Sequence, residues 1–310
     1  MARTYDIPYF DAHCDTLTCT GDSPLRENGG HLDLLRLHRY RTAGQVFAIF
    51  ADGAKYPGED AWRVCRHYYE RFQSETERNR DLVAVCRTGE DARRAAEEGK
   101  VAAFLSIEGA ELLGCAVKRL EEAERWGVRL INLTWNHANA IAGSHMDEPE
   151  RGLSPLGRRF VKEMENRHIL PDVSHLSERA FWDLAEMAEK PIVASHSDAK
   201  AVSPHSRNLT DEQIKAVIRS GGFIGLNAYT EFVGGKADTD ALLAHAEHML
   251  SLGAEDTLGF GSDWDGCDTL AAGLTGVQDM PRIYEELLRR NYSETLVRKI
   301  FYGNLLRVLA

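Results

Sequence analysis

The stretch VAAFLSIE, from Val101 to Glu108, is an almost unbroken apolar run that ends in a carboxylate. The stretch FIGLN, from Phe223 to Asn227, has the same character. Strands that are apolar on both faces are typical of parallel sheets covered by helices. Comparable runs recur along the chain, and we interpret eight segments as strands: Pro8–His13, Gln45–Ala51, Val101–Ile107, Val128–Thr134, Ile169–Ser174, Pro191–Ser195, Gly222–Asn227 and Thr257–Gly261.

Amphipathic stretches such as Ala61–Arg80 and Leu156–Arg167 separate most of these strands. Ser177 is an expected helix N-cap, and Thr210 with Gln213 forms the signature of a capping box. Regular alternation of eight strands with helices predicts an α/β fold, a (β/α)8 TIM barrel that takes up residues 1–310 as a single domain. A doubly wound open sheet is the competing architecture, but the glycine-rich phosphate-binding turns expected of it do not occur in the sequence.

Charge and composition narrow the range of functions. The 310 residues include 37 Lys and Arg against 48 Asp and Glu, a formal net charge of −11, and no block of basic residues. Such a chain has little attraction for nucleic acid or anionic lipid. No apolar run approaches the ~18 residues of a membrane span, and the first residues lack the pattern of a secretion signal. Six cysteines without a C-x-x-C pair fit buried thiols in a reducing compartment, so we expect a cytoplasmic protein without nucleic-acid or membrane partners.

Residues of the kinds that bind metals stand where the expected strands end. His13 and Asp15 end the first strand, and Glu108 ends the third. His175 and His196 end the fifth and sixth. In a barrel the carboxyl ends of all strands meet at one face, where the chemistry takes place. Because His13 and Asp15 are two residues apart, both project to the same side of an extended chain.

Three imidazoles and two carboxylates suit Zn²⁺ or a related divalent ion. Five ligands are more than one catalytic zinc ordinarily takes from a protein. The simplest interpretation is a pair of metal ions about 3.5–4 Å apart, bridged by Glu108 and a hydroxide.

The remaining histidines and the nearby cysteines are interpreted as ordinary structural residues. Cys14 lies between two ligands and is expected to face away from the metals into the core, and Cys267 is expected to be incidental. Most of the remaining histidines fall in expected helices or loops and none ends a strand: His31, His38, His67, His145, His168, His205, His245 and His248.

Short motifs follow one another between about Asp11 and Val308: DAHCDTL, SIEGAE, LTWNHAN, GLSPLGRRFVKEME, LPDVSH, PIVASHSDAKAV, SRNLTDEQI, GFGSDWDG and GNLLRV. In these motifs the chain resembles the membrane dipeptidase (renal dipeptidase) family of binuclear zinc peptidases. The resemblance implies a barrel of the metal-dependent amidohydrolase type with two Zn²⁺ per chain. It also implies hydrolysis of dipeptides, including those with a C-terminal D-residue, and a homodimer, which is common in the family.

The resemblance also implies a role for individual residues. Arg207, in SRNLT, matches the arginine that holds the free carboxylate of the substrate, and a guanidinium group suits a carboxylate because it binds in two-pronged fashion. Asp263 matches the acid that handles the proton, whereas Asp265 is expected to be structural. The two metals would share Glu108, and their other ligands would be His13 and Asp15 for the first and His175 and His196 for the second.

One position departs from the family pattern. Members such as the mammalian enzymes have a histidine, thought to polarise the scissile carbonyl, where this chain has Trp135. His137 lies two residues later and is the candidate to replace that histidine as a catalytic residue. Without it, the metal would perform that role alone.

Two other functions stay open at the level of sequence. The same fold and metal pair would serve an amidohydrolase acting on an N-acyl amino acid, a lactam or a lactone. A catalytically silent barrel that acts as a binding protein would be expected to have lost a metal ligand, and all five are present. The expected partner is therefore a dipeptide or a similar small molecule.

Overall fold

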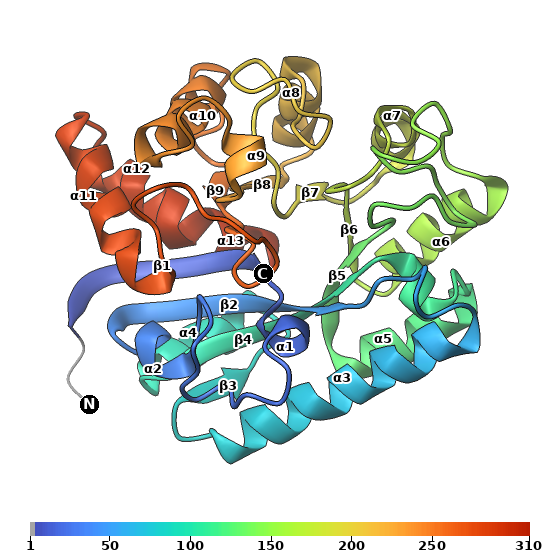
Figure 1. The fold of residues 1–310 in the computed structure, drawn as a ribbon, viewed down its shortest axis with the longest axis horizontal. Coiled ribbons are helices and arrows are strands. Elements are labelled where there is room, and N and C mark those ends of the chain that lie inside the picture. The colour runs from blue at the N-terminus through green and yellow to red at the C-terminus, as the bar shows by residue number, and fades with distance from the viewer. Residues whose placement is uncertain (1–3) are drawn as a thin grey trace.

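The computed structural model describes residues 4–310 and is built around one parallel sheet (Figure 1). The strands follow the order β2-β1-β9-β8-β7-β6-β5-β4, and β4 pairs back with β2, which closes a barrel of eight strands. Each of the eight predicted strands is present, so the predicted barrel is confirmed. The bounds of these strands are β1 (Tyr5–Cys14), β2 (Tyr40–Phe50), β4 (Val101–Glu108), β5 (Val128–Asn132), β6 (Leu170–Asp172), β7 (Val193–Ala194), β8 (Phe223–Leu226) and β9 (Leu258–Phe260).

A further strand, β3 (Val83–Val85), is an addition to the eight predicted strands. It pairs with Val101–Ala103 of β4. The later residues of β4, Leu105–Glu108, pair with β5. With only three residues, of which Val83 is buried and Val85 exposed, β3 has neither a continuous apolar run nor a clear alternation. A sequence pattern does not reveal a strand of this kind.

Helices surround the barrel in the predicted order (Figure 1). Ser177 caps α7, and Thr210 with Gln213 forms the capping box of α8, as predicted. At the C-terminal end, two short helices are joined by a π-helical turn at Lys299–Gly303. The helices are α1 (Thr16–Cys19), α2 (Leu34–Leu37), α3 (Glu59–Arg78), α4 (Gly89–Glu97), α5 (Leu120–Trp126), α6 (Pro155–Asn166), α7 (Glu178–Met187), α8 (Asp211–Arg219), α9 (Thr230–Val233), α10 (Thr239–Ser251), α11 (Met280–Arg289), α12 (Glu294–Arg298) and α13 (Asn304–Val308).

Apolar side chains pack in two clusters, one inside the barrel and one between the barrel and its helices. The inner cluster includes Phe10, Phe104 and Phe223, together with Leu305 and Leu309 from the C-terminal segment. This segment closes the amino end of the barrel, because the Arg307 guanidinium donates to the carbonyls of residues 222 and 256, just before β8 and β9. The opposite, carboxyl end of the strands is thereby left for the functional groups.

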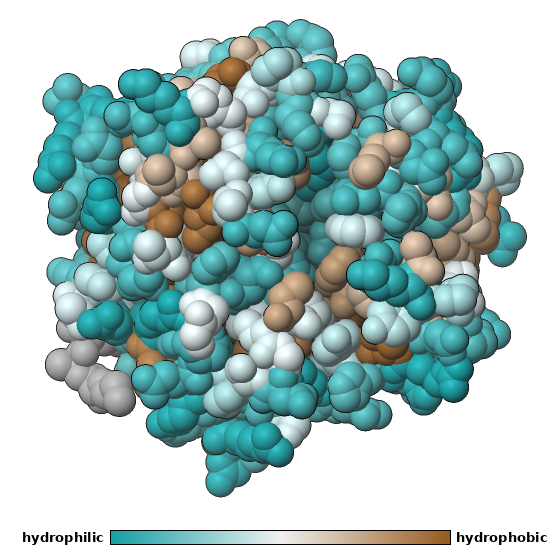
Figure 2. Space-filling model, viewed as in Figure 1, coloured by the Kyte–Doolittle hydropathy of each residue, from teal (hydrophilic) through white to brown (hydrophobic). Residues whose placement is uncertain are grey.

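The outer surface is mainly hydrophilic on the face drawn in Figure 2, where apolar side chains form small separate groups. Within residues 4–310, no helix combines the length and apolar character needed to cross a bilayer.

Strand β1 changes its register at the point where it approaches the carboxyl end. Asp11 pairs with Gln45 of β2, but the next pair is Cys14 with Phe47, so β1 has one extra residue in this interval. Such a bulge re-aims the side chains that follow it. Phe10 belongs to the inner cluster and Cys14 to the outer one, so Cys14 faces the core as predicted, and His13 is free to point into the open end of the barrel.

Candidate metal centre

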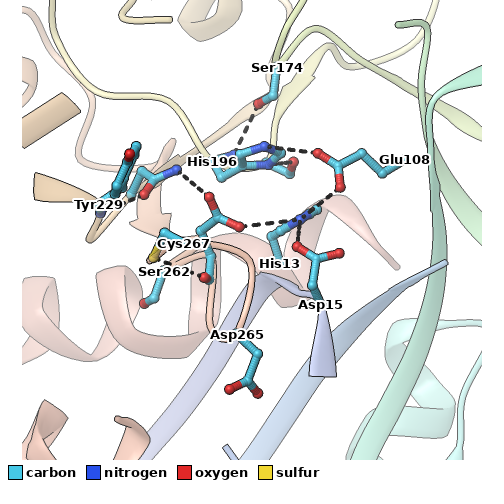
Figure 3. Close-up of polar contacts among 12 residues, drawn as sticks. His13, Asp15, Glu108, Ser174, His196, Tyr229, Ser262, Asp265 and Cys267 are labelled. Carbon is cyan, nitrogen blue, oxygen red and sulfur yellow. Dashed lines mark hydrogen bonds and ion pairs between the residues drawn. The ribbon is translucent and has the colours of Figure 1, made fainter. Parts of the chain in front are cut away.

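Six side chains of metal-binding types converge at the carboxyl end of the barrel, five of them buried and Asp263 partly buried. Figure 3 labels four of them: His13, Asp15, Glu108 and His196. The six side chains come from strands on every side of the barrel or from the residues directly after them. Five are the ligands predicted from the sequence and the sixth is the predicted acid: His13, Asp15, Glu108, His175, His196 and Asp263.

His13 lies at the middle of one half of this cluster. Its Nε2 atom is 3.3 Å from Oδ2 of Asp15, 3.6 Å from Oε2 of Glu108 and 3.8 Å from Oδ1 of Asp263. The sequence argument expected His13 and Asp15 to meet as alternate residues of one strand. They do meet, but β1 ends at Cys14 and Asp15 is already the N-cap of α1.

Glu108 joins this half of the cluster to the other. Its second oxygen, Oε1, lies 2.9 Å from Nε2 of His175 and 3.5 Å from Nε2 of His196. The two imidazole nitrogens are themselves 2.9 Å apart. One carboxylate oxygen of Glu108 therefore faces each half, which is the arrangement that a bridging ligand requires.

The donor set fits divalent cations. Oδ1 of Asp15 is buried and has no hydrogen-bond partner among the described residues, and a buried acceptor of this kind ordinarily has a partner. Gly266 borders the same space: a Cβ atom there would lie 2.2 Å from oxygens of both Asp15 and Asp263. Two groups, His13–Asp15–Asp263 and His13–Glu108–His196, bring their ligand atoms within 4.8 Å of one another. Imidazole and carboxylate ligands are those of Zn²⁺ and related ions.

The electrostatics of the two halves differ. Burial, together with repulsion from Asp15, raises the pKa of Glu108 to about 7. Burial alone would lower the pKa of His13, but the carboxylates of Glu108 and Asp15 outweigh it and raise that pKa well above its ordinary value. Burial and the positive charge of Arg207 lower the pKa of His175 well below its ordinary value. Burial and the positive charges of His13 and Arg207 do the same for His196. These two rings are therefore neutral and able to act as metal ligands.

Two buried aspartates join the strand ends that carry the ligands. Asp11 accepts hydrogen bonds from the backbone N–H of His13 at 3.0 Å and of Ser262 at 3.1 Å, so it joins β1 to the segment that leads to Asp263. Asp172 does the same for the other half, because it accepts from the backbone N–H groups of residues 174 and 195, each at 3.0 Å. Each half of the cluster thus rests on a carboxylate that joins two neighbouring strand ends.

The backbone is strained at two site residues. His175 has φ 71° and Asp263 has φ 62°, in the left-handed region that non-glycine residues rarely adopt. Such conformations cost of order 1–3 kcal/mol each and persist where the surroundings impose them, commonly at functional sites. Asp265 has a similar backbone, but its side chain points away from the cluster (Figure 3). It accepts from the Thr16 hydroxyl and from the backbone N–H of His31, each at 2.6 Å, in line with its expected structural role.

A cavity of about 530 Å³ opens beside the cluster, and Arg207 lines it. The guanidinium of Arg207 is buried; Nη2 donates to the carbonyl of His196 at 3.1 Å and Nη1 to the Ser197 hydroxyl at 3.4 Å. Its Nε has no partner among the described residues, and the group lies 5.2 Å from the centre of the Phe232 ring. A buried guanidinium with a spare donor is suited to an anionic group of a ligand.

The structure does not bring His137 to the cluster. Its side chain is half exposed, 4.0 Å from Asp52, and it is not among the residues that line the cavity. Trp135 does line the cavity, against Phe50 at 4.9 Å between ring centres. The histidine of this loop that reaches the cavity is His145, which the sequence analysis assigned to ordinary structural residues.

Other residues of the cavity also escaped prediction. Cys267, expected to be incidental, lines it, and so does Asn136. Asn136 follows Trp135 in the motif LTWNHAN, two residues after the predicted strand Val128–Thr134. Its place in this motif and its position after a strand end were the signals that pointed to it. His145 has no such signal, because the loop between β5 and α6 has no repeating pattern from which a side chain's direction could be predicted.

The fold and this cluster define a metal-dependent hydrolase of the (β/α)8 barrel class. The chain belongs to the membrane dipeptidase family, peptidase family M19, whose sequence profile matches residues 4–310. Membership makes the protein a hydrolase, a metallopeptidase that acts on dipeptides.

Individual relatives agree with this assignment. Dipeptidase tcpJ of Claviceps purpurea is 30% identical over 300 residues, which are 92% of this chain and 70% of that protein. An uncharacterised protein of Klebsiella pneumoniae, encoded 5′ of pqqA, is 35% identical over 239 residues, 73% of this chain and 88% of its own. The crystal structure of a metallopeptidase from Rhodobacter sphaeroides, bound to a phosphinate mimic of the dipeptide L-Ala-D-Ala, has a TM-score of 0.89 and 29% identity, and covers 98% of this chain and 99% of its own.

Proposed function

We propose that the protein is a dipeptidase that uses two Zn²⁺ ions held on either side of Glu108. The observation that carries the proposal is the position of this carboxylate, with one oxygen toward His13 and the other toward His175 and His196. Asp15 completes the first group of ligands. When bound, the ions would lower the pKa of a water molecule and would polarise the substrate carbonyl.

Arg207 is proposed to bind the C-terminal carboxylate of the dipeptide. Within residues 4–310 it forms no ion pair, although it is buried and one of its donors is unpaired. A substrate carboxylate would supply the missing charge and the missing acceptor. The dipeptide mimic bound by the Rhodobacter sphaeroides relative is a ligand of the same kind. Because this anchor lies beside the cluster, it would limit the substrate to one residue beyond the bond that is cleaved.

Asp263 is proposed to take a proton from the attacking water and pass it to the leaving amine. Its Oδ2 accepts from the Asn227 amide at 3.1 Å, which leaves Oδ1 toward His13. Burial raises its pKa, and this makes it a better proton acceptor near neutral pH. The variant Asp263→Asn should retain its zinc and lose most of its turnover, while Asp6→Asn, at an exposed acid near the start of β1 and away from the cavity, should keep both. Loss of zinc together with turnover would make Asp263 a ligand instead of a proton carrier.

The rim of the cavity favours a dipeptide over an N-acyl amino acid. Glu231, in α9, and Asp268, in the loop after β9, line it, and an isolated bridge between Tyr229 and Leu270 joins the two segments. Burial and the nearby carboxylates of Glu231 and Asp268 raise the pKa of Tyr229. These two carboxylates give the rim of the cavity a negative character, which suits the free ammonium group of a dipeptide. An N-acyl group lacks this charge.

A substrate panel tests the proposed function. Purified zinc-loaded protein would be assayed against dipeptides with L- or D-residues at the C-terminal position, against the matching N-acetyl amino acids, and against a lactam and a lactone. We expect cleavage of the dipeptides, D-forms included, and little or none of the others. Cleavage confined to the N-acetyl amino acids, the lactam or the lactone would overturn the proposal in favour of another amidohydrolase reaction. No cleavage of any substrate by zinc-loaded protein would favour a silent binding barrel.

A further inference from the structure

The amide of Asn136 lies between two histidines at the edge of the cluster. Its Oδ1 atom is 2.8 Å from Nδ1 of His175 and 2.9 Å from Nε2 of His145. A carbonyl oxygen can only accept, so both imidazoles donate to it. His175 therefore has its proton on Nδ1, and its Nε2 carries the lone pair that faces Glu108 and His196. A metal ligand needs its free nitrogen held in this state.

His145 holds this arrangement from the other side of the amide. Because its Nε2 donates to Asn136, its Nδ1 accepts, and the hydroxyl of Ser206 lies 2.8 Å away as the donor. A ring with one donor and one acceptor nitrogen is the neutral form of histidine.

The backbone of the loop reinforces these contacts. The backbone N–H of His145 donates to the carbonyl of His175 at 2.8 Å, and Ser144 forms an isolated antiparallel bridge with Leu176. His145 is therefore attached to His175 twice, once through main chain and once through Asn136. It is also hydrogen-bonded to Ser206, the residue that directly precedes Arg207.

We propose that His145 is a positioning residue that fixes the orientation and tautomer of His175 and joins it to the loop that carries Arg207. In the loop between β5 and α6, His145 is hydrogen-bonded to a residue that contacts the cluster, whereas His137 is half exposed. The inference rests on the proposed function only in taking His175 as a zinc ligand. It assigns no contact with the substrate to His145.

The test compares two substitutions at His145 with one at His137. The full-length protein is stripped of metal and titrated with zinc alone. In His145→Phe, which keeps a ring but removes both polar atoms, we expect the affinity for the more weakly bound zinc to fall by about 10- to 100-fold, as for other residues that orient a ligand. His145→Gln retains a donor and an acceptor, so it should recover most of that loss. His137→Phe, the matched control on the same loop, should bind zinc as the wild type does.

A spectroscopic readout separates positioning from a role in stability alone. In ¹⁵N spectra of histidine-labelled protein, we expect His175 to be protonated on Nδ1 in the wild type and in His145→Gln. In His145→Phe, we expect His175 to be a mixture of the Nδ1- and Nε2-protonated forms. Unchanged zinc affinity and an unchanged His175 spectrum in folded His145→Phe would overturn the proposal. So would a larger effect from His137→Phe. Both readouts are independent of the substrate, so failure to cleave dipeptides would overturn the proposed function and leave this inference standing.

Discussion

The two halves of the metal centre are supported alike but charged differently. Each rests on a buried aspartate that joins neighbouring strand ends, Asp11 on one side and Asp172 on the other. The half around His13 is rich in carboxylates, whereas the other half offers neutral imidazoles next to the positive charge of Arg207. A cation should therefore be attracted more strongly to the first half. In the second half, binding should depend more on how precisely the ligands are held.

The largest effect is expected from removing the residue that the halves share. In Glu108→Gln, a neutral amide replaces the carboxylate. Its NH₂ group cannot bind a metal ion, so the bridge between the halves is lost. We expect zinc content to fall and turnover to drop by at least about 10⁴-fold, as when a member of a concerted catalytic group is removed. Zinc content would be measured by elemental analysis beside the dipeptide assay. Glu98→Gln, at an exposed acid, is the control and should behave as the wild type.

The imidazole half can be tested through Arg207. Arg207→Lys retains the charge but loses the two-pronged geometry, and we expect KM for dipeptides to rise by about 10- to 100-fold with little change in kcat, the range for a lost charged hydrogen bond. Arg63→Lys, at an exposed arginine, should leave both constants unchanged. If kcat falls instead of KM rising, then the hydrogen bond from Arg207 to the His196 carbonyl, which supports the metal ligand, matters more than substrate binding.

The carboxylate half can be disturbed alone through Gly266. A methyl group at this position would collide with the oxygens of Asp15 and Asp263, so Gly266→Ala must displace at least one of them. We expect about a tenfold loss of affinity for the more tightly bound zinc, at the lower end of the effects seen when a ligand is displaced indirectly. Gly29→Ala, where a Cβ atom would meet nothing within 4 Å, is the control. Equal zinc affinities in the two variants would show that the space beside Gly266 is not used.

The last prediction concerns the stability of metal-free protein. The pKa of Glu108 is raised from 4.5 to about 7 in the folded state, so its favourable contribution is complete below pH 4.5 and is lost as the pH rises to about 7. Metal-free Glu108→Gln should therefore match the wild type near pH 4.5 and be more stable by a few kcal/mol at pH 8, since each pKa unit corresponds to 1.36 kcal/mol. Urea unfolding at both pH values measures the difference. A gain in stability that is the same at both pH values would contradict the assigned cause.

Much of this fold and site follows from the sequence because it depends on local regularities. Apolar runs such as Val101–Glu108 reveal the strands, and the residues that end them fall at one face of any parallel barrel. The features that the sequence did not predict lie where this regularity ends. The bulge before His13 and the strand Val83–Val85 depend on how neighbouring strands pair. The choice between His137 and His145 depends on the path of an irregular loop. Hydrogen bonds that join His145 to Asn136 and Ser206 fix this path, and no periodicity in the sequence encodes it.

The most direct test of the account is the number of zinc ions that one chain binds. Metal-free protein would be titrated with zinc and followed by native mass spectrometry. The account predicts two ions per chain, bound in two steps of unequal affinity, with the second step weakened by Glu108→Gln. Saturation at a single ion would contradict a centre bridged by Glu108. So would a second ion that Glu108→Gln binds as tightly as the wild type does.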